Sequence, residues 1–152
     1  MKRWERWTFA LAALVVALSG GAYFWMKYLM ATDDPYAVVN HPWQPVMLSA
    51  HVLASPGLLL MFGIILSSHI LRKLGARGIP NRKSGLISFG CFFVMTASGY
   101  LLQVATADAA LRVLVAVHVV SGVLFSAVYV AHLVISVRLA RRAPAPLLVR
   151  TA

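Results

Sequence analysis

The chain has 152 residues, of which 61% are hydrophobic and only 12% are charged. About a quarter of the residues in a soluble domain are charged, so this composition excludes an ordinary soluble protein and predicts an integral membrane protein. The net charge is +10, but the Lys and Arg residues lie mostly in short segments that flank apolar runs. No basic face with interleaved aromatic residues is present, which excludes nucleic acid as a partner. The single cysteine, Cys91, excludes an intrachain disulfide, and the lack of a C-x-x-C-H motif excludes covalently attached haem.

Four apolar segments follow one another along the chain, each at or above the roughly 20 residues with which a helix crosses a bilayer. They run approximately over 7–30, 45–71, 84–104 and 110–139. Helix is expected for all four, because open strand edges cannot satisfy their hydrogen bonds in lipid. The predicted fold is therefore all-α, an integral membrane four-helix bundle that forms a single transmembrane domain over residues 1–152.

The first segment has the general form of a secretory signal peptide, with M-K-R-W-E-R-W before an apolar run and small residues at 19–22. We expect it to be the first spanning helix instead. No internal repeat of 20 to 50 residues is evident. The tail A-P-A-P-L-L-V-R is expected to be extended or disordered.

The charges between the segments predict the orientation in the membrane. The connections between the first and second segments and between the third and fourth hold three of the four acidic residues and a single base, Arg112. By the positive-inside rule, the basic clusters lie in the cytoplasm, so both termini are expected there. The basic clusters are Lys2, Arg3 and Arg6 before the first segment, Arg72, Lys73, Arg77, Arg82 and Lys83 after the second, and Arg138, Arg141, Arg142 and Arg150 after the fourth.

Four of the five histidines lie inside predicted helices, where ionisable side chains are costly and commonly mark function. His51 and His69 lie on the second helix, and His118 and His132 lie on the fourth. At about 100° per residue, the 18-residue step from His51 to His69 returns to nearly the same face of the second helix. The 14-residue step from His118 to His132 ends about 40° from the starting face of the fourth helix. Both helices run from outside to inside. We therefore expect His51 to meet His118 near the outer face and His69 to meet His132 near the inner face.

Two imidazoles at one depth suit a haem iron better than a zinc ion. Zinc needs about four close ligands, and no Cys, Asp or Glu lies near these histidines within the helices. A haem needs two axial ligands and a broad apolar slot. The sequence thus predicts two non-covalent haem b groups between the second and fourth helices. His51 and His118 are the expected ligands of the outer iron, and His69 and His132 those of the inner iron.

Glycines and cations near the histidines are candidates for further haem contacts. Gly122 follows His118 by four residues on the same face, so it is the best candidate for haem clearance, with ordinary small-residue helix packing as the alternative. Haem propionates need cationic or hydrogen-bonding partners at the interfaces. For each cation, the alternative role is a topology charge in water. The candidate cations are Arg72, Lys73 and Arg138 inside and Arg112 outside.

Two features fit this scheme less simply. The 18-residue interval exceeds the 14-residue one by about 6 Å of helix rise, which helix tilt or a kink at Pro56 has to absorb. His41 lies in the outer connection N-H-P-W-Q-P. We expect it to be a loop histidine without chemistry, the alternative being that it lines a quinone entrance or a docking surface.

The segment from Arg82 to Val137 resembles a known family. It includes T-A-S-G-Y-L-L and H-V-V-S-G-V-L-F-S-A-V-Y-V-A-H-L, and it is similar to the cytochrome b561-like membrane subunits of bacterial respiratory enzymes. That group includes the haem b subunits of formate dehydrogenases and nickel-iron hydrogenases and small four-helix proteins of the DUF4405 type. The resemblance implies bis-histidine haem b, quinone exchange at one face, a partner redox subunit at the other, and a place in the bacterial cytoplasmic (inner) membrane. This chain departs from the formate dehydrogenase subunit, which also takes a ligand from the first helix.

The expected function is that of an electron-transfer subunit that moves electrons between quinone and a partner redox protein, such as a multihaem cytochrome or an iron-sulfur protein. The connections are too short for a catalytic domain, so a stand-alone enzyme is not expected. One alternative is a small transporter or metal-handling protein that uses histidines as proton or metal relays. The other is a structural assembly subunit without a cofactor, whose histidines form hydrogen bonds within the bundle.

Overall fold

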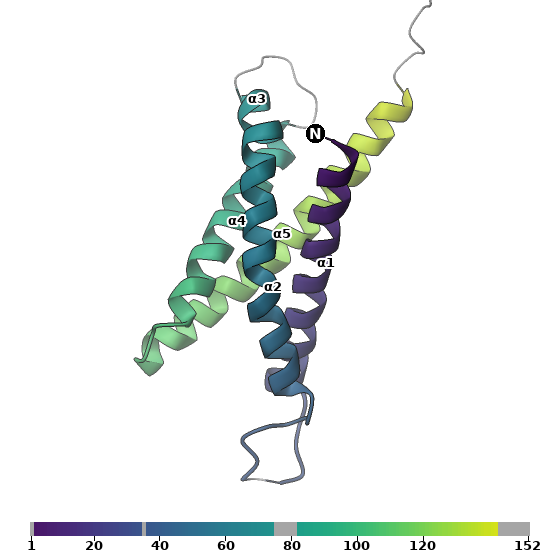
Figure 1. The fold of residues 1–152 in the computed structure, drawn as a ribbon. Helices are drawn as coiled ribbons and strands as arrows, with labels where there is room; N and C mark the ends of the chain where they lie inside the picture. The colour runs from purple at the N-terminus through teal and green to yellow at the C-terminus, as the bar shows by residue number, and fades with distance from the viewer. Residues whose placement is uncertain (1, 35, 75–81, 143–152) are drawn as a thin grey trace, which may run out of the picture. The chain divides into compact units, whose positions relative to one another are not determined.

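A computed structural model describes residues 2–34, 36–74 and 82–142, and every regular element in these ranges is a helix. This confirms the predicted all-α class. Two of the elements are π-helical and follow an α-helix without a break. In chain order (Figure 1) the elements are α1 (Arg3–Phe24), η1 (Trp25–Leu29), α2 (Gln44–Ile65), η2 (Leu66–Ile70), α3 (Leu71–Leu74), α4 (Arg82–Leu102) and α5 (Asp108–Arg142). The expectations for Arg77, Arg150 and the C-terminal tail lie outside the described residues.

Four helical segments are long and apolar enough to cross a membrane, as predicted. They differ from the predicted segments by a few residues at each end, and many of their large apolar side chains are exposed, for example Leu53 at 79% and Phe93 at 69%. Side chains of this kind on the outside of a helix are expected where lipid is the solvent. The chain therefore has the helices of a multi-pass membrane protein. The segments are Arg3–Leu29, Gln44–Lys73, Arg82–Leu102 and Asp108–Leu139.

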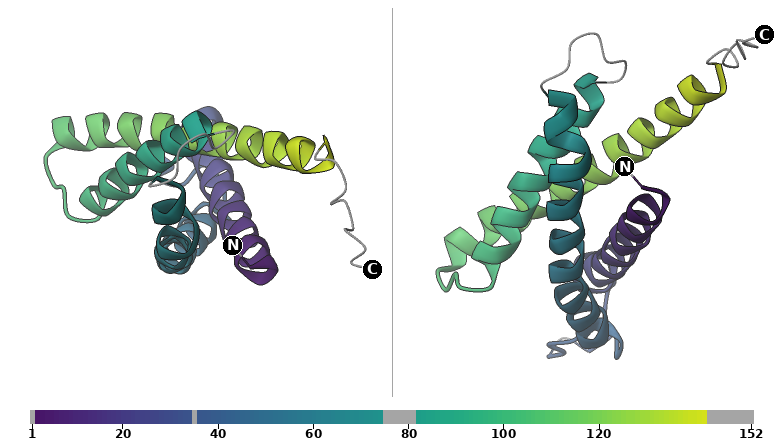
Figure 2. Two further views of the ribbon diagram at one scale, coloured as in Figure 1. Left: turned by 90° about the horizontal axis from the view of Figure 1, so that it is seen from above. Right: turned by 45° about the horizontal axis from the view of Figure 1, so that its top comes forward.

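The chain forms two compact units, Met1–Gly78 and Ile79–Ala152. In the first unit α1 packs against α2, and in the second α4 packs against α5. Each unit is thus an antiparallel helical hairpin, and Figure 2 shows both hairpins from two further directions. At 1.5 Å per residue, the 35 residues of α5 extend over about 52 Å and the 21 residues of α4 over about 31 Å, so α5 continues well past its partner.

Aromatic side chains pack across both hairpins. In the first, the rings of Phe9 on α1 and Phe62 on α2 lie with their centroids 6.4 Å apart. In the second, Phe92 on α4 meets Phe125 on α5 edge to face at 5.3 Å, and Phe125 stacks on Tyr129 at 5.7 Å. Edge-to-face and offset arrangements are the favoured geometries of aromatic pairs. An aromatic contact therefore joins the two helices of each hairpin, near the start of α1 in the first and near the middle of α4 and α5 in the second.

Asn40 forms hydrogen bonds at both ends of the connection between η1 and α2. Its side-chain amide donates hydrogen bonds to the carbonyl oxygens of Lys27, at 3.1 Å, and Met30, at 3.3 Å, which lie at the C-terminal end of η1. Its backbone N–H donates to Oε1 of the buried Gln44 at 3.2 Å. Asn40 thus caps the end of one helix and joins it to the first turn of the next.

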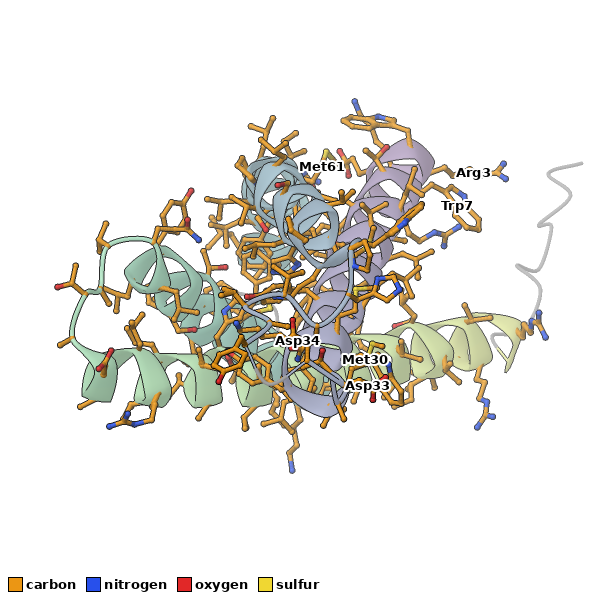
Figure 3. All side chains as sticks on the ribbon, turned by 90° about the horizontal axis from the view of Figure 1, so that it is seen from below. Arg3, Trp7, Met30, Asp33, Asp34 and Met61 are labelled. Atoms are coloured by element: carbon orange, nitrogen blue, oxygen red, sulfur yellow. The ribbon has the colours of Figure 1, made fainter. Side chains whose placement is uncertain are left out.

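The charged residues of the first hairpin lie at opposite ends. Figure 3 shows Arg3 and Trp7 at the start of α1, and Met30, Asp33 and Asp34 beyond the end of η1. Glu5 also lies at the start of α1 and Lys27 lies in η1, so each end has charges of both signs. The charged side chains of this hairpin therefore lie toward the two ends of its helices.

Candidate functional site

His51 on α2 forms a hydrogen bond to the backbone of α1. Its Nδ1 lies 2.9 Å from the carbonyl oxygen of Val16. A carbonyl oxygen can only accept a hydrogen bond, so Nδ1 must be the donor, and the lone pair of the neutral ring is then on Nε2. The local contact thus fixes one tautomer of this histidine.

The two residues Ser19 and Gly20 complete the contact between His51 and α1. A Cβ atom on Gly20 would lie 2.7 Å from both Cε1 and Nδ1 of His51, a distance at which one of the groups would have to move. Ser19 Oγ donates to the carbonyl oxygens of Val15 at 2.7 Å and Val16 at 3.2 Å. Glycine at position 20 is therefore required for the imidazole to approach the helix backbone.

His118 on α5 makes the same contact with α4. Its Nδ1 lies 2.9 Å from the carbonyl oxygen of Met95 and 3.4 Å from Ser98 Oγ. Ser98 Oγ also donates to the carbonyl oxygens of Val94 at 2.8 Å and Met95 at 3.0 Å. A Cβ atom on Gly99 would lie 3.0 Å from Cε1 and 3.2 Å from Nδ1 of His118. The tautomer is fixed as it is for His51.

The two contacts use equivalent positions on α1 and α4, separated by 79 residues in each case. The carbonyl acceptors on the two helices belong to Val16 and Met95, and a Ser-Gly pair follows three residues later in both. Sequence reasoning missed this correspondence because it considered repeats of 20 to 50 residues only. The signal that identifies it is short, V-A-L-S-G in one helix and M-T-A-S-G in the other.

His132 lies at the other end of the α4–α5 hairpin. Its Nδ1 is 3.0 Å from Ser84 Oγ, and a Cβ atom on Gly85 would lie 3.4 Å from its Cε1. Ser84 and Gly85 are in the first turn of α4, whereas the residues that contact His118 are near the end of that helix. The two histidines of this hairpin therefore contact α4 at two different levels along its axis.

His69 lies at the corresponding end of the first hairpin, within the π-helical segment η2. The preceding residue, Ser68, donates from Oγ to Oε2 of Glu5 at 3.2 Å. Glu5 is only 4% exposed and is in the first turn of α1. It precedes Ser84, the partner of His132, by the same 79 residues. Each hairpin thus has a polar side chain in the first turn of its first helix, a carboxylate in one and a hydroxyl in the other.

The π-helical segment changes the helical-face arithmetic for His51 and His69. A π turn closes its hydrogen bonds from i to i+5, and the extra residue rotates the following side chains by up to about 100° relative to an unbroken α-helix. Ile65 is buried and lies 14 residues, or two heptads, after His51. His69 follows Ile65 by four residues, which is about one π turn. With the π-helical turn of η2 between them, His69 therefore lies on nearly the same side of the helix as Ile65.

Gly122 and the cations predicted to contact the haems are described by their local contacts and their exposure. A Cβ atom on Gly122 would lie 3.6 Å from Met95 Sδ, so this glycine packs against α4, beside the residue whose carbonyl contacts His118. The candidate cations are all exposed: Arg72 and Lys73 on α3, three and four residues after His69, and Arg112 and Arg138 on α5.

His41 takes part in a local turn at the start of α2. Its Nδ1 accepts a hydrogen bond from the backbone N–H of Trp43 at 3.1 Å, and its carbonyl oxygen accepts one from the N–H of Gln44 at 2.9 Å. Nδ1 is the acceptor here, so the proton of the neutral ring is on Nε2. His51 and His118 have the other tautomer. The two hydrogen bonds of His41 stabilise the turn that leads into α2.

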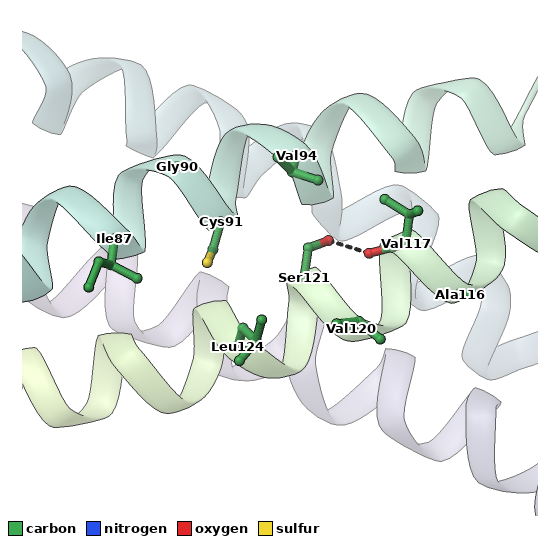
Figure 4. A pocket seen from close by; sticks show the side chains of 9 residues that line it. All are labelled: Ile87, Gly90, Cys91, Val94, Ala116, Val117, Val120, Ser121 and Leu124. Carbon is green, nitrogen blue, oxygen red and sulfur yellow. Dashed lines mark hydrogen bonds between the residues drawn. The ribbon is translucent and has the colours of Figure 1, made fainter.

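An apolar groove runs between α4 and α5 within the second hairpin (Figure 4). Gly90 and Cys91 on α4 and Ala116 and Val120 on α5 are among its lining residues. The hydroxyl of Ser121 faces its own helix and donates to the Val117 carbonyl at 2.6 Å. The groove therefore offers small and apolar side chains.

Over the described ranges 2–34, 36–74 and 82–142, no three His, Cys, Asp or Glu side chains gather as a metal-binding group. Comparison with known proteins gives no match: no protein-family model, no curated protein and no solved structure is significantly similar to this chain.

Proposed function

We propose that this chain is a membrane electron-transfer subunit that binds two haem b groups through histidine pairs. In this proposal His51 and His118 are the ligands of one iron, and His69 and His132 are the ligands of the other. The pairing is the one predicted from the sequence. Three observations within the hairpins support a role of these histidines as haem ligands.

The tautomer of His51 and His118 is the observation that supports the proposal most directly. Histidines that bind a metal commonly donate their other ring N–H to a backbone carbonyl or a carboxylate, which fixes the ring and raises its basicity. His51 and His118 donate from Nδ1 to the carbonyl oxygens of Val16 and Met95, both at 2.9 Å. In each ring, Nε2 is then the nitrogen with the lone pair that an iron requires.

The glycines support the proposal in a second way. Gly20 and Gly99 lie so close to a histidine of the facing helix that an added Cβ atom would crowd the imidazole, and Gly85 lies in ordinary contact distance of His132. Each of these contacts keeps an imidazole packed against the other helix of the same hairpin. A ligand that is held in place before the metal binds costs less to order when it binds.

The third observation is the depth of the histidines. Within the second hairpin, His118 contacts the end of α4 and His132 contacts its first turn. Within the first, His51 contacts the second half of α1, and Ser68, next to His69, contacts its first turn. Both hairpins thus present histidines at two depths, which is what two haems, one nearer each side of a membrane, require.

A bis-histidine haem supplies one-electron oxidation and reduction with little rearrangement at the iron. The chain contributes the axial ligands, their orientation and an apolar surrounding that tunes the potential. The proposal further includes both termini in the cytoplasm of a bacterium, quinone or quinol as one exchange partner, and a redox protein as the other. Arg72, Arg112 and Arg138 are proposed to contact the propionates.

The same hydrogen bonds favour a second candidate, a structural subunit without a cofactor. A buried imidazole that donates to a neighbouring helix stabilises a hairpin by about 0.5–1.5 kcal/mol without any metal. The transporter alternative predicts pH-dependent flux or binding of a divalent metal by a colourless protein. An absorbance spectrum of the purified protein separates these functions, because only the haem protein has a Soret band and reducible α bands.

A further inference from the structure

The carbonyl oxygens of Val16 and Met95 each accept hydrogen bonds from two side chains. At Val16 these are His51 Nδ1, at 2.9 Å, and Ser19 Oγ, at 3.2 Å. At Met95 the imidazole donor lies at 2.9 Å and the serine hydroxyl at 3.0 Å. An imidazole and a hydroxyl therefore share one acceptor in both hairpins.

Serine hydroxyls often donate to a carbonyl one turn earlier in the same helix, and this alone has no functional meaning. Ser126, for example, donates to the Gly122 carbonyl at 2.9 Å. Ser19 and Ser98 differ because the carbonyl that they contact also accepts an imidazole N–H. They are also well buried, at 7% and 4% exposure, so water does not replace their hydroxyl groups as donors.

A carbonyl oxygen has two lone pairs. Val16 and Met95 lie within α1 and α4, where the N–H of the residue four positions later takes one of them. The imidazole and the serine then compete for the remaining acceptor capacity. Removal of the serine hydroxyl makes the carbonyl a better acceptor and strengthens the imidazole bond.

We propose that Ser19 and Ser98 are positioning residues that set the strength of the bonds from His51 and His118 to these carbonyls, and thereby the reduction potential of the haem that the two histidines bind. The last step rests on the proposed function. A stronger Nδ1–H bond makes the imidazole more basic. A more basic ligand stabilises the ferric form over the ferrous form, which lowers the potential.

Ser19 gives the cleaner test of this effect. Ser98 Oγ also lies 3.4 Å from His118 Nδ1, so its loss removes a polar contact of the ring in addition to a competitor for the carbonyl. The two changes act in opposite directions on the ring. We therefore expect Ser98→Ala to shift the potential less than Ser19→Ala.

The first experiment is a redox titration of the purified haem protein, followed by absorbance. Ser19→Ala is expected to lower the midpoint potential of one haem, and to change the ratio of oxidised to reduced haem at a fixed potential by at most about tenfold, or 59 mV for one electron. Ser126→Ala is the matched control and is expected to leave both midpoints unchanged. A Ser19→Ala protein that retains both haems with unchanged midpoints would overturn the proposal.

The second experiment needs no haem and therefore tests the hydrogen bond separately from the proposed function. Infrared spectra are recorded with methionine labelled at the ¹³C carbonyl, and the band of Met95 is assigned by its loss in Met95→Leu. Ser98→Ala is expected to move this band to higher frequency, because the carbonyl loses a donor, whereas Ser126→Ala leaves it in place. An unmoved band in Ser98→Ala would overturn the shared-acceptor arrangement. A wild-type protein without haem, with the band moved as expected, would contradict the proposed function only.

Discussion

Gly20 and His51 are in direct contact across the first hairpin: a Cβ atom on the glycine would lie 2.7 Å from both Cε1 and Nδ1 of the imidazole. Gly99 and His118 repeat the contact in the second hairpin, at 3.0 and 3.2 Å. In each pair the space for the imidazole comes from the first helix of a hairpin and the imidazole itself from the second. The site residues therefore include the glycines as well as the histidines.

Gly20→Ala should displace His51. The added methyl group overlaps the ring, which costs about 1–3 kcal/mol where a packed site has to rearrange, and the bond to the Val16 carbonyl is lost with it. We expect a lower melting temperature and the loss of one of the two haems, measured by circular dichroism in detergent and by haem content per chain.

Gly21→Ala is the matched control for that substitution. A Cβ atom at Gly21 meets no atom within 4 Å, so the change only improves helix propensity, by up to about 1 kcal/mol. We expect unchanged haem content and equal or higher stability. If Gly20→Ala and Gly21→Ala behave alike in both assays, the contact with His51 does not matter.

The four membrane histidines should fall into two pairs when they are substituted singly. His51→Ala and His118→Ala are expected to remove the same haem, and His69→Ala and His132→Ala the other, because each iron loses one of its two axial ligands. Low-temperature absorbance and electron paramagnetic resonance spectra distinguish the two haems. Loss of different signals in His51→Ala and His118→Ala would refute the pairing.

Glu5→Ala should weaken the first hairpin at the end where α1 begins. The buried carboxylate accepts hydrogen bonds from the backbone N–H of Lys2 at 2.8 Å and from Ser68 Oγ at 3.2 Å. Their loss leaves the half-buried Ser68 hydroxyl and the N-terminus of α1 without this acceptor, which costs about 1–3 kcal/mol. Thermal unfolding measures the change, and Asp33→Ala in the exposed connection is the control. Equal melting temperatures for the two variants would show that Glu5 does not stabilise this end of the hairpin.

His41→Ala should leave the absorbance spectrum unchanged. This histidine accepts a hydrogen bond from Trp43 at the start of α2, so we expect only the loss of a turn contact, about 0.5–1.5 kcal/mol. Haem content and the melting temperature give the two readouts. A variant that folds normally but lacks a haem would place His41 among the ligands and contradict the proposed histidine pairs.

The number and type of the helices could be predicted from the sequence because they depend on composition and length alone. The four apolar segments become four spanning helices with small differences at their ends. The histidines could be named because they lie within the apolar segments, where ionisable side chains are costly and commonly mark function. The division into two hairpins follows from packing between neighbouring helices, which no residue pattern in the chain makes obvious.

The partners of the histidines could not be predicted. Ser19 and Gly20 look like ordinary small helix residues, and only the structure shows that Gly20 lies against His51 and that Ser19 shares the Val16 carbonyl with it. Gly122 shares a helix face with His118, and only the structure shows that it also lies against the side chain of Met95. The π-helical turn at His69 was also missed, because residue spacing assumes a uniform 3.6 residues per turn. Contacts between helices and local changes in helix type are properties of packing.

The most direct test of haem binding is the reduced-minus-oxidised absorbance spectrum of the purified protein, together with a pyridine haemochrome assay of haem per chain. We predict a Soret band, reducible α bands and a haemochrome of the b type with two haems per chain, reduced to one in His118→Ala. A protein that folds as a helical membrane protein but is colourless when produced with ample haem would contradict the proposed function.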